Sequence, residues 1–359
     1  MQRRRNLRRT ASPQSACICP ICCVVPPHML EQIIRHGNEN QRTWAFETLR
    51  ASEQFRGRRQ IIGNITFMAQ PGEKRRTVFD AQQSERLPGR LVRTEGQPPT
   101  GDPAVDEAYD GAGATYDLYF ELFERNSIDD RGLRLDSTVH FSVDYDNAFW
   151  NGSQMVYGDG DGELFNRFTI AVDVIGHELT HGVTQYEANL NYSGESGALN
   201  ESFSDVFGSL VKQRVLNQTA DQADWLIGAG LLTDRVQGVA LRSLKAPGTA
   251  YDDPVLGRDP QPGQVSDQYR GRADDGGVHI NSGIPNRAFY LTAVALGGYA
   301  WEKAGRIWYL ALRDRLRSTA TFRRAANATV ALAGELYGPG GTEQQAVRSA
   351  WQQVGVLQS

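Results

Sequence analysis

The chain has 359 residues, of which 40% are hydrophobic and 22% charged, and its formal net charge is −4. This composition is typical of a globular protein in water, and the weak negative charge gives no reason to expect nucleic acid or an anionic membrane surface as a partner. No run of about 18 apolar residues is present, so no transmembrane helix is expected. The length favours two domains with an additional N-terminal segment.

The chain begins with a basic stretch followed by a cysteine cluster. Five arginines lie in MQRRRNLRR and a short apolar run follows, as in a signal peptide, but Pro20 interrupts the run and no clear small-residue cleavage site follows. All four cysteines, Cys17, Cys19, Cys22 and Cys23, lie in ACICPICC, so disulfides cannot hold the main body together. Their spacing fits neither a zinc ribbon nor a ferredoxin run, which favours packing or redox chemistry over a metal cluster.

The next segment has a helical pattern at residues 28–55. Two basic stretches follow, RGRR at 56–59 and EKRR at 73–76, with glycine and proline nearby. Such stretches are typical of exposed linkers that proteases cut. The first 60–70 residues therefore appear as a separable unit.

The rest of the chain changes character near residue 165. Residues 77–165 alternate like strands and are dense in turn residues, with one helix expected at 104–126. A loop rich in glycine, proline and aspartate spans 236–278, and loops of that length usually serve a function. Beyond residue 165 the patterns predict helices at 169–187, 199–216, 280–297, 299–316, 318–337 and 342–354.

Within the first of these helices, VIGHELTHGVTQ at 174–185 places His177 and His181 four residues apart. That spacing puts both imidazoles on one helix face, where both can reach a single metal ion. Glu178 lies next to them and can act as a base toward a water that the metal activates. The motif alone leaves a second interpretation open, in which two polar residues lie on a solvated helix face.

A candidate third ligand follows in GALNESFSDVFGSL at 197–210. Glu201 opens the expected second helix, and Asp205 is four residues further on the same face. A catalytic zinc needs a third protein ligand and an open position, and a nearby carboxylate can accept the other N–H of a ligand histidine. A solvated acidic face is the alternative, but the flanking apolar residues argue against it.

Four blocks resemble the thermolysin family of zinc metallopeptidases in sequence, order and approximate spacing. They are DNAFWNGSQMVYGDGDG at 146–162, HELTHGVTQYEANLNYSGESGALNESFSD at 177–205, LRS at 241–243 and DDGGVHINSGIPNRAFYL at 274–291. The resemblance covers roughly residues 77–359, and CCVVPPHMLEQI at 22–33 resembles the short propeptide of the protealysin-type branch. It implies an α+β, two-domain fold with a β-rich N-terminal domain, a mainly α-helical C-terminal domain, and the active-site cleft and HExxH helix between them.

The resemblance also implies domain limits and site residues. Residues 1–68 are expected to form the propeptide, 69–190 the β-rich subdomain ending in the HExxH helix, and 191–359 the helical subdomain. One zinc ion is expected on His177, His181 and Glu201. The catalytic residues expected beside it are Glu178 as general base, Tyr192 and His279 as oxyanion donors, Asp274 orienting His279, and Asp205.

Substrate contacts follow from the same resemblance. Asn147, the Ala148 carbonyl, Trp150 and Arg242 are expected to bind the substrate backbone, and Phe165, Phe168, Val174 and Leu241 to line the pocket for the next side chain. Phe168 is larger than the leucine usual in the family, which predicts a smaller pocket. Cleavage is expected on the N-terminal side of hydrophobic residues.

The family's double calcium site is predicted to be absent. Asp173 and Asp224 match two of its ligands, but Lys212, Leu226 and Ala229 occupy the other acidic positions. A lysine cannot ligate calcium, so we expect its ammonium to pair with Asp173 in the vacated space.

The resulting hypothesis is a zinc endopeptidase made as a zymogen, acting on protein or peptide substrates. Its own propeptide would inhibit it intramolecularly until a cut between about Arg56 and Arg76, either by steric blockage or through a cysteine on the zinc. A catalytically silent binding module and a structural-zinc protein are the competing hypotheses; the full set of catalytic residue types and the three-ligand pattern disfavour them. The resemblance also implies secretion, with cytoplasmic storage or non-classical export as alternatives, and a monomer.

Overall fold

The computed structural model describes residues 22–58 and 72–358. Its described strands form one six-stranded sheet, in the order β1-β5-β6-β4-β2-β3, and two two-stranded sheets, β7-β8 and β9-β10. The six-stranded sheet is mixed, because β4 pairs in parallel with β2 and β6 whereas its other pairs are antiparallel. The strands are β1 (Cys22–Cys23), β2 (Arg76–Asp80), β3 (Arg90–Thr94), β4 (Leu135–Val139), β5 (Ala148–Trp150), β6 (Met155–Tyr157), β7 (Leu226–Ile227), β8 (Arg242–Ser243), β9 (Asp252–Asp253) and β10 (Gly257–Arg258).

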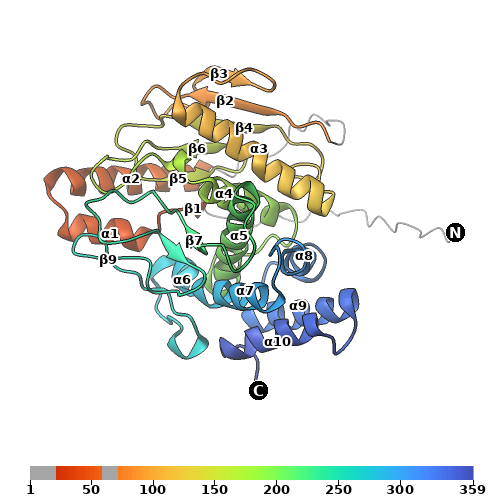
Figure 1. The fold of residues 1–359 in the computed structure, drawn as a ribbon. Coiled ribbons are helices and arrows are strands. Elements are labelled where there is room, and N and C mark those ends of the chain that lie inside the picture. Colours follow the sequence, from red (N-terminus) through yellow and green to blue (C-terminus); the bar gives the residue numbers. More distant parts are fainter. Residues whose placement is uncertain (1–21, 59–71, 359) are drawn as a thin grey trace.

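Helices make up most of the remainder. The α-helices are α1 (Pro27–His36), α2 (Glu39–Arg58), α3 (Pro103–Phe123), α4 (Val172–Tyr186), α5 (Gly194–Val215), α6 (Ala273–Asn281), α7 (Gly283–Leu296), α8 (Ala304–Leu310), α9 (Phe322–Tyr337) and α10 (Thr342–Gln353). Short 3₁₀ turns occur at Phe168–Ile170 and Val265–Asp267, and a π turn at Ala311–Arg315 continues α8. In Figure 1 the sheet and α3 form the upper part, α6 to α10 the lower part, and α4 and α5 lie between them.

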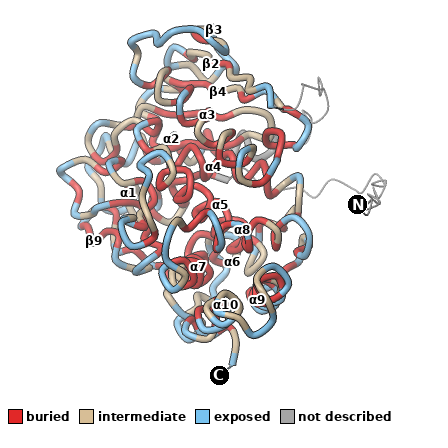
Figure 2. Tube along the Cα trace, turned by 45° about the vertical axis from the view of Figure 1, so that its right-hand side comes forward, coloured by how far each residue is buried: buried red, intermediate tan, exposed pale blue. Residues whose placement is uncertain are grey.

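The α4 helix lies in the interior. Every residue from Asp173 to Thr184 is buried, and Figure 2 shows α4 and α5 as buried segments at the centre of the molecule. The interpretation of the histidine pair as part of a solvated helix face is therefore wrong. The α+β, two-domain expectation is confirmed, with strands concentrated before α4 and helices after it.

Two glycines let α4 and α5 approach each other closely. A Cβ on Gly208 would lie 2.3 Å from the Asp173 carbonyl oxygen, and one on Gly176 would lie 3.0 Å from the Gly208 Cα. Only glycine leaves room for this backbone contact. The contact brings the middle of α5 against the face of α4 that carries the two histidines.

The structure refines several expected elements. The helical pattern at 28–55 is two helices, because α1 ends at Gly37 before α2 begins. The second site helix begins at Gly194 rather than at residue 199, so Glu201 lies two turns inside it. The loop at 236–278 contains the short strands β8 to β10.

The EKRR stretch is not an open linker. Arg76 begins β2 and pairs with Glu95, and Lys74 pairs with Asp117. The ion pairs and the sheet hold this stretch against the body, so the expectation of an exposed linker was wrong here. The last residue of RGRR lies outside the described residues, and so does most of the suggested processing region. Cys17 and Cys19 also lie outside them.

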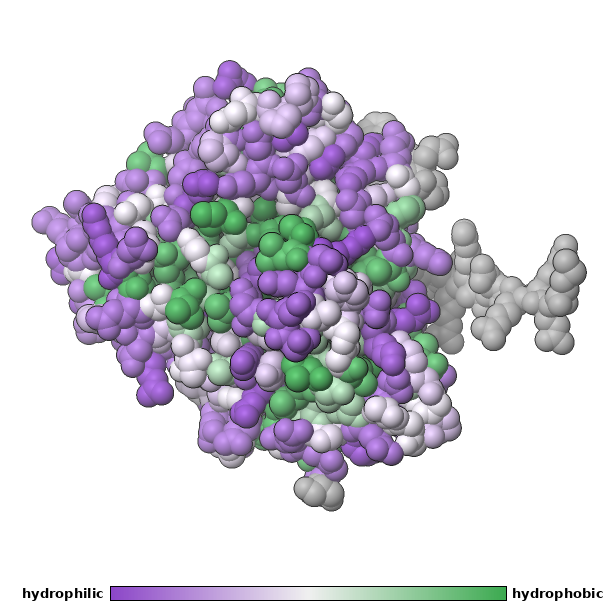
Figure 3. Space-filling view, in the orientation of Figure 1, coloured by the Kyte–Doolittle hydropathy of each residue, from purple (hydrophilic) through white to green (hydrophobic). Residues whose placement is uncertain are grey.

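The surface in the view of Figure 3 is mainly hydrophilic, with hydrophobic residues gathered in separate patches. None of the described helices combines the length and the apolar character needed to cross a membrane.

Candidate active site

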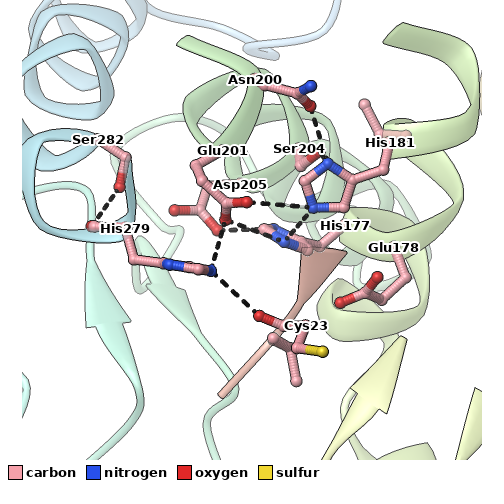
Figure 4. Close-up of polar contacts among 12 residues, drawn as sticks. Cys23, His177, Glu178, His181, Asn200, Glu201, Ser204, Asp205, His279 and Ser282 are labelled. Atoms are coloured by element: carbon pink, nitrogen blue, oxygen red, sulfur yellow. Dashed lines mark hydrogen bonds and ion pairs between the residues drawn. The ribbon is translucent and has the colours of Figure 1, made fainter. Parts of the chain in front are cut away.

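Two helices bring His177, His181 and Glu201 together. The histidines come from α4 and the glutamate from α5, and Figure 4 shows the three side chains converging. The two Nε2 atoms are 3.0 Å apart, and each lies 3.5 Å from an oxygen of Glu201. Among the described residues, these three form the group of histidine, cysteine and acidic side chains that could hold a metal ion.

The outer nitrogens of both histidines are held by α5. His177 Nδ1 donates to Asp205 Oδ1 at 2.8 Å, and His181 Nδ1 lies 2.8 Å from Asn200 Oδ1 and 3.0 Å from Ser204 Oγ. These bonds place the ring proton on Nδ1, which leaves both Nε2 lone pairs turned toward Glu201. Asn200 and Ser204 are not among the residues predicted from the sequence. Each directly precedes a site carboxylate on the same helix, and this position was the signal available.

This donor set fits zinc. Two imidazole nitrogens and one carboxylate oxygen are the ligands of many catalytic zinc sites, which keep one position open. The Oε2 atom of Glu201 is buried and has no hydrogen-bond partner in the described part of the chain. A buried carboxylate oxygen is costly without a partner, and a cation at this point would satisfy it.

Asp205 is the centre of a buried polar group. Besides His177, it accepts hydrogen bonds from the guanidinium of Arg242, with the closest pair at 2.9 Å, and from Asn286 Nδ2 at 2.8 Å. Burial alone would raise the pKa of Asp205, but the Arg242 guanidinium and His177 outweigh it and hold the pKa well below its usual range. Asp205 is therefore a fixed anion that orients both His177 and Arg242.

Glu178 is fully buried beside the metal group. Its Oε2 accepts a hydrogen bond from the backbone N–H of Trp150 at 3.0 Å. Trp150 ends β5, so this bond joins the candidate base to a strand of the sheet. The candidate base thus shares α4 with the two histidines and is bonded to a strand of the sheet.

His279 and Tyr192 stand on the other side of the group. His279 Nε2 lies 3.1 Å from the Tyr192 hydroxyl and 3.7 Å from Glu201 Oε2. His279 Nδ1 donates to Asp274 Oδ1 at 2.6 Å. Burial alone would lower the pKa of His279, but the carboxylates of Glu201 and Asp274 outweigh it and raise the pKa to about 9. The protonated ring can donate from both nitrogens at neutral pH.

The DDGG sequence explains why Asp274 reaches His279. All four residues from Asp274 to Gly277 have positive φ, between 48° and 85°. Glycine adopts this left-handed region freely, and aspartate tolerates it better than most residues. The turn folds the Asp274 side chain over the following helical residues, where Oδ2 also accepts from the backbone N–H groups of His279 and Ile280.

The N-terminal segment lies along the residues expected to bind a substrate backbone. Val24 N–H donates to the Ala148 carbonyl at 3.2 Å, and Arg242 Nη1 donates to the Val24 carbonyl at 2.9 Å. Asn147 bonds both polar groups of the next residue, accepting from Val25 N–H at 2.9 Å and donating to its carbonyl at 3.2 Å. Every one of these bonds uses the backbone of the N-terminal segment.

The expected pocket residues are buried. Phe165, Phe168, Val174 and Leu241 are at most 2% exposed and belong to the main hydrophobic core, as does Val24. The rings of Phe165 and Phe168 lie with centroids 5.8 Å apart. Val24 thus belongs to the same core as these residues, and the N-terminal segment is bonded to Asn147, Ala148 and Arg242.

Cys23 meets the site through its backbone. Its carbonyl oxygen faces His279 Nε2 at 3.2 Å, as Figure 4 shows. Its side chain belongs to a small hydrophobic cluster with Ala51, Phe141, Tyr145, Phe149 and Val156, and it is not part of the metal group among the described residues. The alternative of a cysteine on the metal therefore finds no support at Cys23.

A second group of charges lies one turn from the first, toward the start of α4, with Asp173 buried and Asp224 exposed. The Lys212 ammonium lies 2.7 Å from Asp173 Oδ2 and 2.8 Å from Asp224 Oδ1, and it donates to the Leu226 carbonyl at 2.6 Å. The expected pairing of Lys212 with Asp173 is thus present. Burial alone would lower the pKa of Lys212, but Asp173 and Asp224 together raise it, so the side chain is a permanent cation.

Comparison with known proteins gives consistent matches. The catalytic domain of the thermolysin metallopeptidases matches residues 64–185, and their alpha-helical domain matches residues 188–356. An extracellular metalloprotease of Pectobacterium carotovorum subsp. carotovorum is 54% identical, with 94% of this chain and 97% of that protein covered. A protease of a Photorhabdus species, PrtS, is 47% identical over 93% of this chain and 91% of its own length.

Among solved structures, the precursor of protealysin, a metalloproteinase from Serratia proteamaculans, has a similar fold. It is 55% identical, covers 94% of this chain and 100% of its own, and superposes with a TM-score of 0.87.

Proposed function

The chain belongs to the thermolysin family of metallopeptidases and is a metalloprotease, and we propose that it is a zinc endopeptidase made as a latent precursor. One observation carries this proposal: Glu178, Tyr192 and His279 surround the group formed by His177, His181 and Glu201. These residues provide a metal site, a base and two hydrogen-bond donors around one point. Peptide hydrolysis needs all three.

In the proposed reaction each residue has a separate task. Bound zinc would polarise the substrate carbonyl and activate water. Glu178 takes the proton of the attacking water and passes it to the leaving amine. His279 and Tyr192 donate to the developing oxyanion, and Asp274 holds the His279 ring in place. Removing one such donor typically lowers the rate by about 10²–10³-fold.

Substrates are proposed to bind as the N-terminal segment does, with Asn147, Ala148 and Arg242 bonding the backbone. Phe165, Phe168, Val174 and Leu241 would then favour a hydrophobic residue after the cleaved bond, and the bulk of Phe168 favours a small one. Trp150 lies in the same strand as Ala148, and its backbone N–H donates to Glu178.

Latency follows from the covered cleft. Arg242 and His279, two groups that a substrate would need, are bonded to Val24 and Cys23. We propose that residues 1–68 are the propeptide and that residues 69–190 and 191–359 are the two catalytic subdomains. We further propose that the mature enzyme is a secreted monomer, in keeping with relatives named extracellular metalloproteases.

Calcium is proposed to play no part at the Asp173 group, because the Lys212 ammonium stands between its carboxylates. A lysine ammonium there supplies the positive charge that a bound cation would otherwise provide.

The test uses full-length protein loaded with one equivalent of zinc and assayed after incubation with a quenched peptide reporter. Chelation is expected to abolish hydrolysis and zinc alone to restore it. Glu178→Ala is expected to bind zinc normally but to hydrolyse neither the reporter nor itself. Wild-type activity in that variant would overturn the proposed mechanism.

A further inference from the structure

The N-terminal segment crosses the site in one fixed register. β1 pairs antiparallel with β5, with Cys22 opposite Trp150 and Cys23 opposite Phe149. Trp150 in turn donates its backbone N–H to Glu178. The pairing therefore carries the backbone of Cys23 past the candidate base.

The carbonyl of Cys23 is the one placed for reaction. Its oxygen lies 3.2 Å from His279 Nε2, the donor that also contacts Tyr192 and lies 3.7 Å from Glu201. An oxyanion formed at this oxygen would lie at hydrogen-bond distance from His279 Nε2, which is the placement of a donor that stabilises a tetrahedral intermediate.

The residues after this carbonyl are clamped on both sides. Val24 bonds the Ala148 carbonyl through its N–H and Arg242 through its carbonyl, and Val25 makes two bonds to Asn147. Both valines are fully or almost fully buried. Holding the reacting group in place in this way replaces a bimolecular encounter by an intramolecular one, which lowers the barrier.

We propose that the docked segment is itself a substrate and that the zinc-loaded chain cuts its own Cys23–Val24 bond. This inference rests on the proposed function. Water adds its oxygen to the Cys23 carbonyl carbon and gives a proton to Glu178. The C–N bond then breaks as Glu178 returns this proton to the Val24 nitrogen. The second proton of the water leaves the new carboxyl group and also passes to that nitrogen, so the products are a Cys23 carboxylate and a Val24 ammonium.

This cut does not open the cleft. The chain beyond Val24 continues into α1, whose Met29, Leu30 and Ile33 are buried in the main core. The Val24 end therefore stays docked on Arg242 and Asn147 after the bond is broken. The cut releases the residues that precede it, and activity toward other substrates appears only after a second cut further along the chain.

The experiment follows full-length, zinc-loaded chain by intact mass and N-terminal mapping over time. A fragment ending at Cys23 and a new N-terminus at Val24 are expected to appear before reporter hydrolysis begins. The rate constant is expected to be independent of chain concentration. Glu178→Ala and Glu178→Gln, each checked for bound zinc and for folding, should slow the cut by about 10²–10⁴-fold. Val25→Ala, which leaves the reacting bond unchanged, should still cut at Cys23–Val24.

A second readout needs neither metal nor catalysis. In the metal-free chain, hydrogen exchange at the Val24 and Val25 amides should be slowed by at least about tenfold relative to the unfolded chain, because both amides are bonded within the cleft. Unprotected amides would overturn the register on which the proposal depends.

The other outcomes separate this inference from the proposed function. Reporter hydrolysis with cuts mapped only elsewhere would overturn the Cys23–Val24 site and leave the endopeptidase intact. A cutting rate proportional to chain concentration would show cleavage between molecules and overturn the intramolecular reaction. Zinc-bound chain that cuts neither itself nor any reporter would overturn the proposed function, and this inference with it.

Discussion

The α4–α5 pair holds two groups of charges, each with a buried carboxylate, and the charge of these carboxylates is balanced differently. At one end Asp173 and Asp224 meet the Lys212 ammonium. One turn along α4, Glu201 faces the imidazoles of His177 and His181.

The difference shows what makes a buried acidic group a metal site. At Asp173 the chain supplies its own cation, so the charge is compensated without a ligand. At Glu201 the Nε2 atoms of His177 and His181 converge on the carboxylate, and Glu201 Oε2 keeps no hydrogen-bond partner among the described residues. The same helix pair thus carries one group that supplies its own cation and one whose side chains could hold a metal ion.

The largest effect is expected from removing a ligand. Glu201→Ala should lose tightly bound zinc and reduce peptide hydrolysis below detection, because two histidines alone leave the metal without its carboxylate. Zinc content by atomic absorption and reporter hydrolysis measure the two losses. Tight stoichiometric zinc in this variant would contradict the ligand assignment.

Removing the internal cation should instead affect folding. Lys212→Ala should lower the free energy of unfolding by about 3–5 kcal/mol, because it leaves the buried Asp173 carboxylate without its counter-charge. Denaturant unfolding measures the change, and zinc binding should persist in the folded fraction. Asp173→Asn added to Lys212→Ala should recover part of the loss, and no recovery would argue against the ion pair as its source.

Replacing Lys212 by a carboxylate should turn the Asp173 group into a calcium site. Wild-type melting temperature should not change when calcium is added, since Lys212 fills the space. Lys212→Glu brings a third carboxylate to Asp173 and Asp224, and its melting temperature should rise with calcium. A wild-type chain that needs calcium for stability would contradict the proposed role of Lys212.

A smaller effect is expected from the residues that orient the ligands. Asn200→Ala should weaken zinc binding by about 10–100-fold, because His181 Nδ1 then loses its 2.8 Å partner. Competition with a chromophoric chelator measures the affinity. Ser204→Ala is the matched test of the second partner, and unchanged affinity in both variants together would show that His181 needs no such support.

The smallest effect is expected from His28, a third buried group with no counter-charge bonded to it. Both ring nitrogens are buried and have no hydrogen-bond partner within residues 22–58 and 72–358, and Asp274, His279 and Arg242 are the charged groups around the ring. Burial lowers the pKa of His28 from 6.5 to about 4 and outweighs the opposing effect of Asp274.

The lowered pKa of His28 sets how docking of the N-terminal segment depends on pH. The docked segment favours neutral His28, so docking is at full strength above about pH 6.5 and weakens as the pH falls toward about 4. Hydrogen exchange of the α1 amides at pH 7 and pH 5 should show faster opening at pH 5, and His28→Leu should reduce this difference. An equal difference in His28→Leu would exclude His28 as its source.

The fold class and much of the site could be predicted from the sequence. His177 and His181 are four residues apart on one helix, and Glu201 and Asp205 are four residues apart on another. The helix period alone places such pairs on one face. Periodicity also located most helices of the C-terminal half, although glycines at 194 and 197 hid the true start of α5.

What the sequence by itself determined is therefore the local geometry of each motif and, through its resemblance, the family. Only the tertiary structure decided how the motifs meet. The contact of Gly176 with Gly208 sets the register of α4 on α5, and this register brings Asn200 and Ser204 to His181. The pairing of β1 with β5 likewise places Cys23 beside His279, 256 residues away in the sequence. Such contacts depend on close packing between distant segments, which no local pattern encodes.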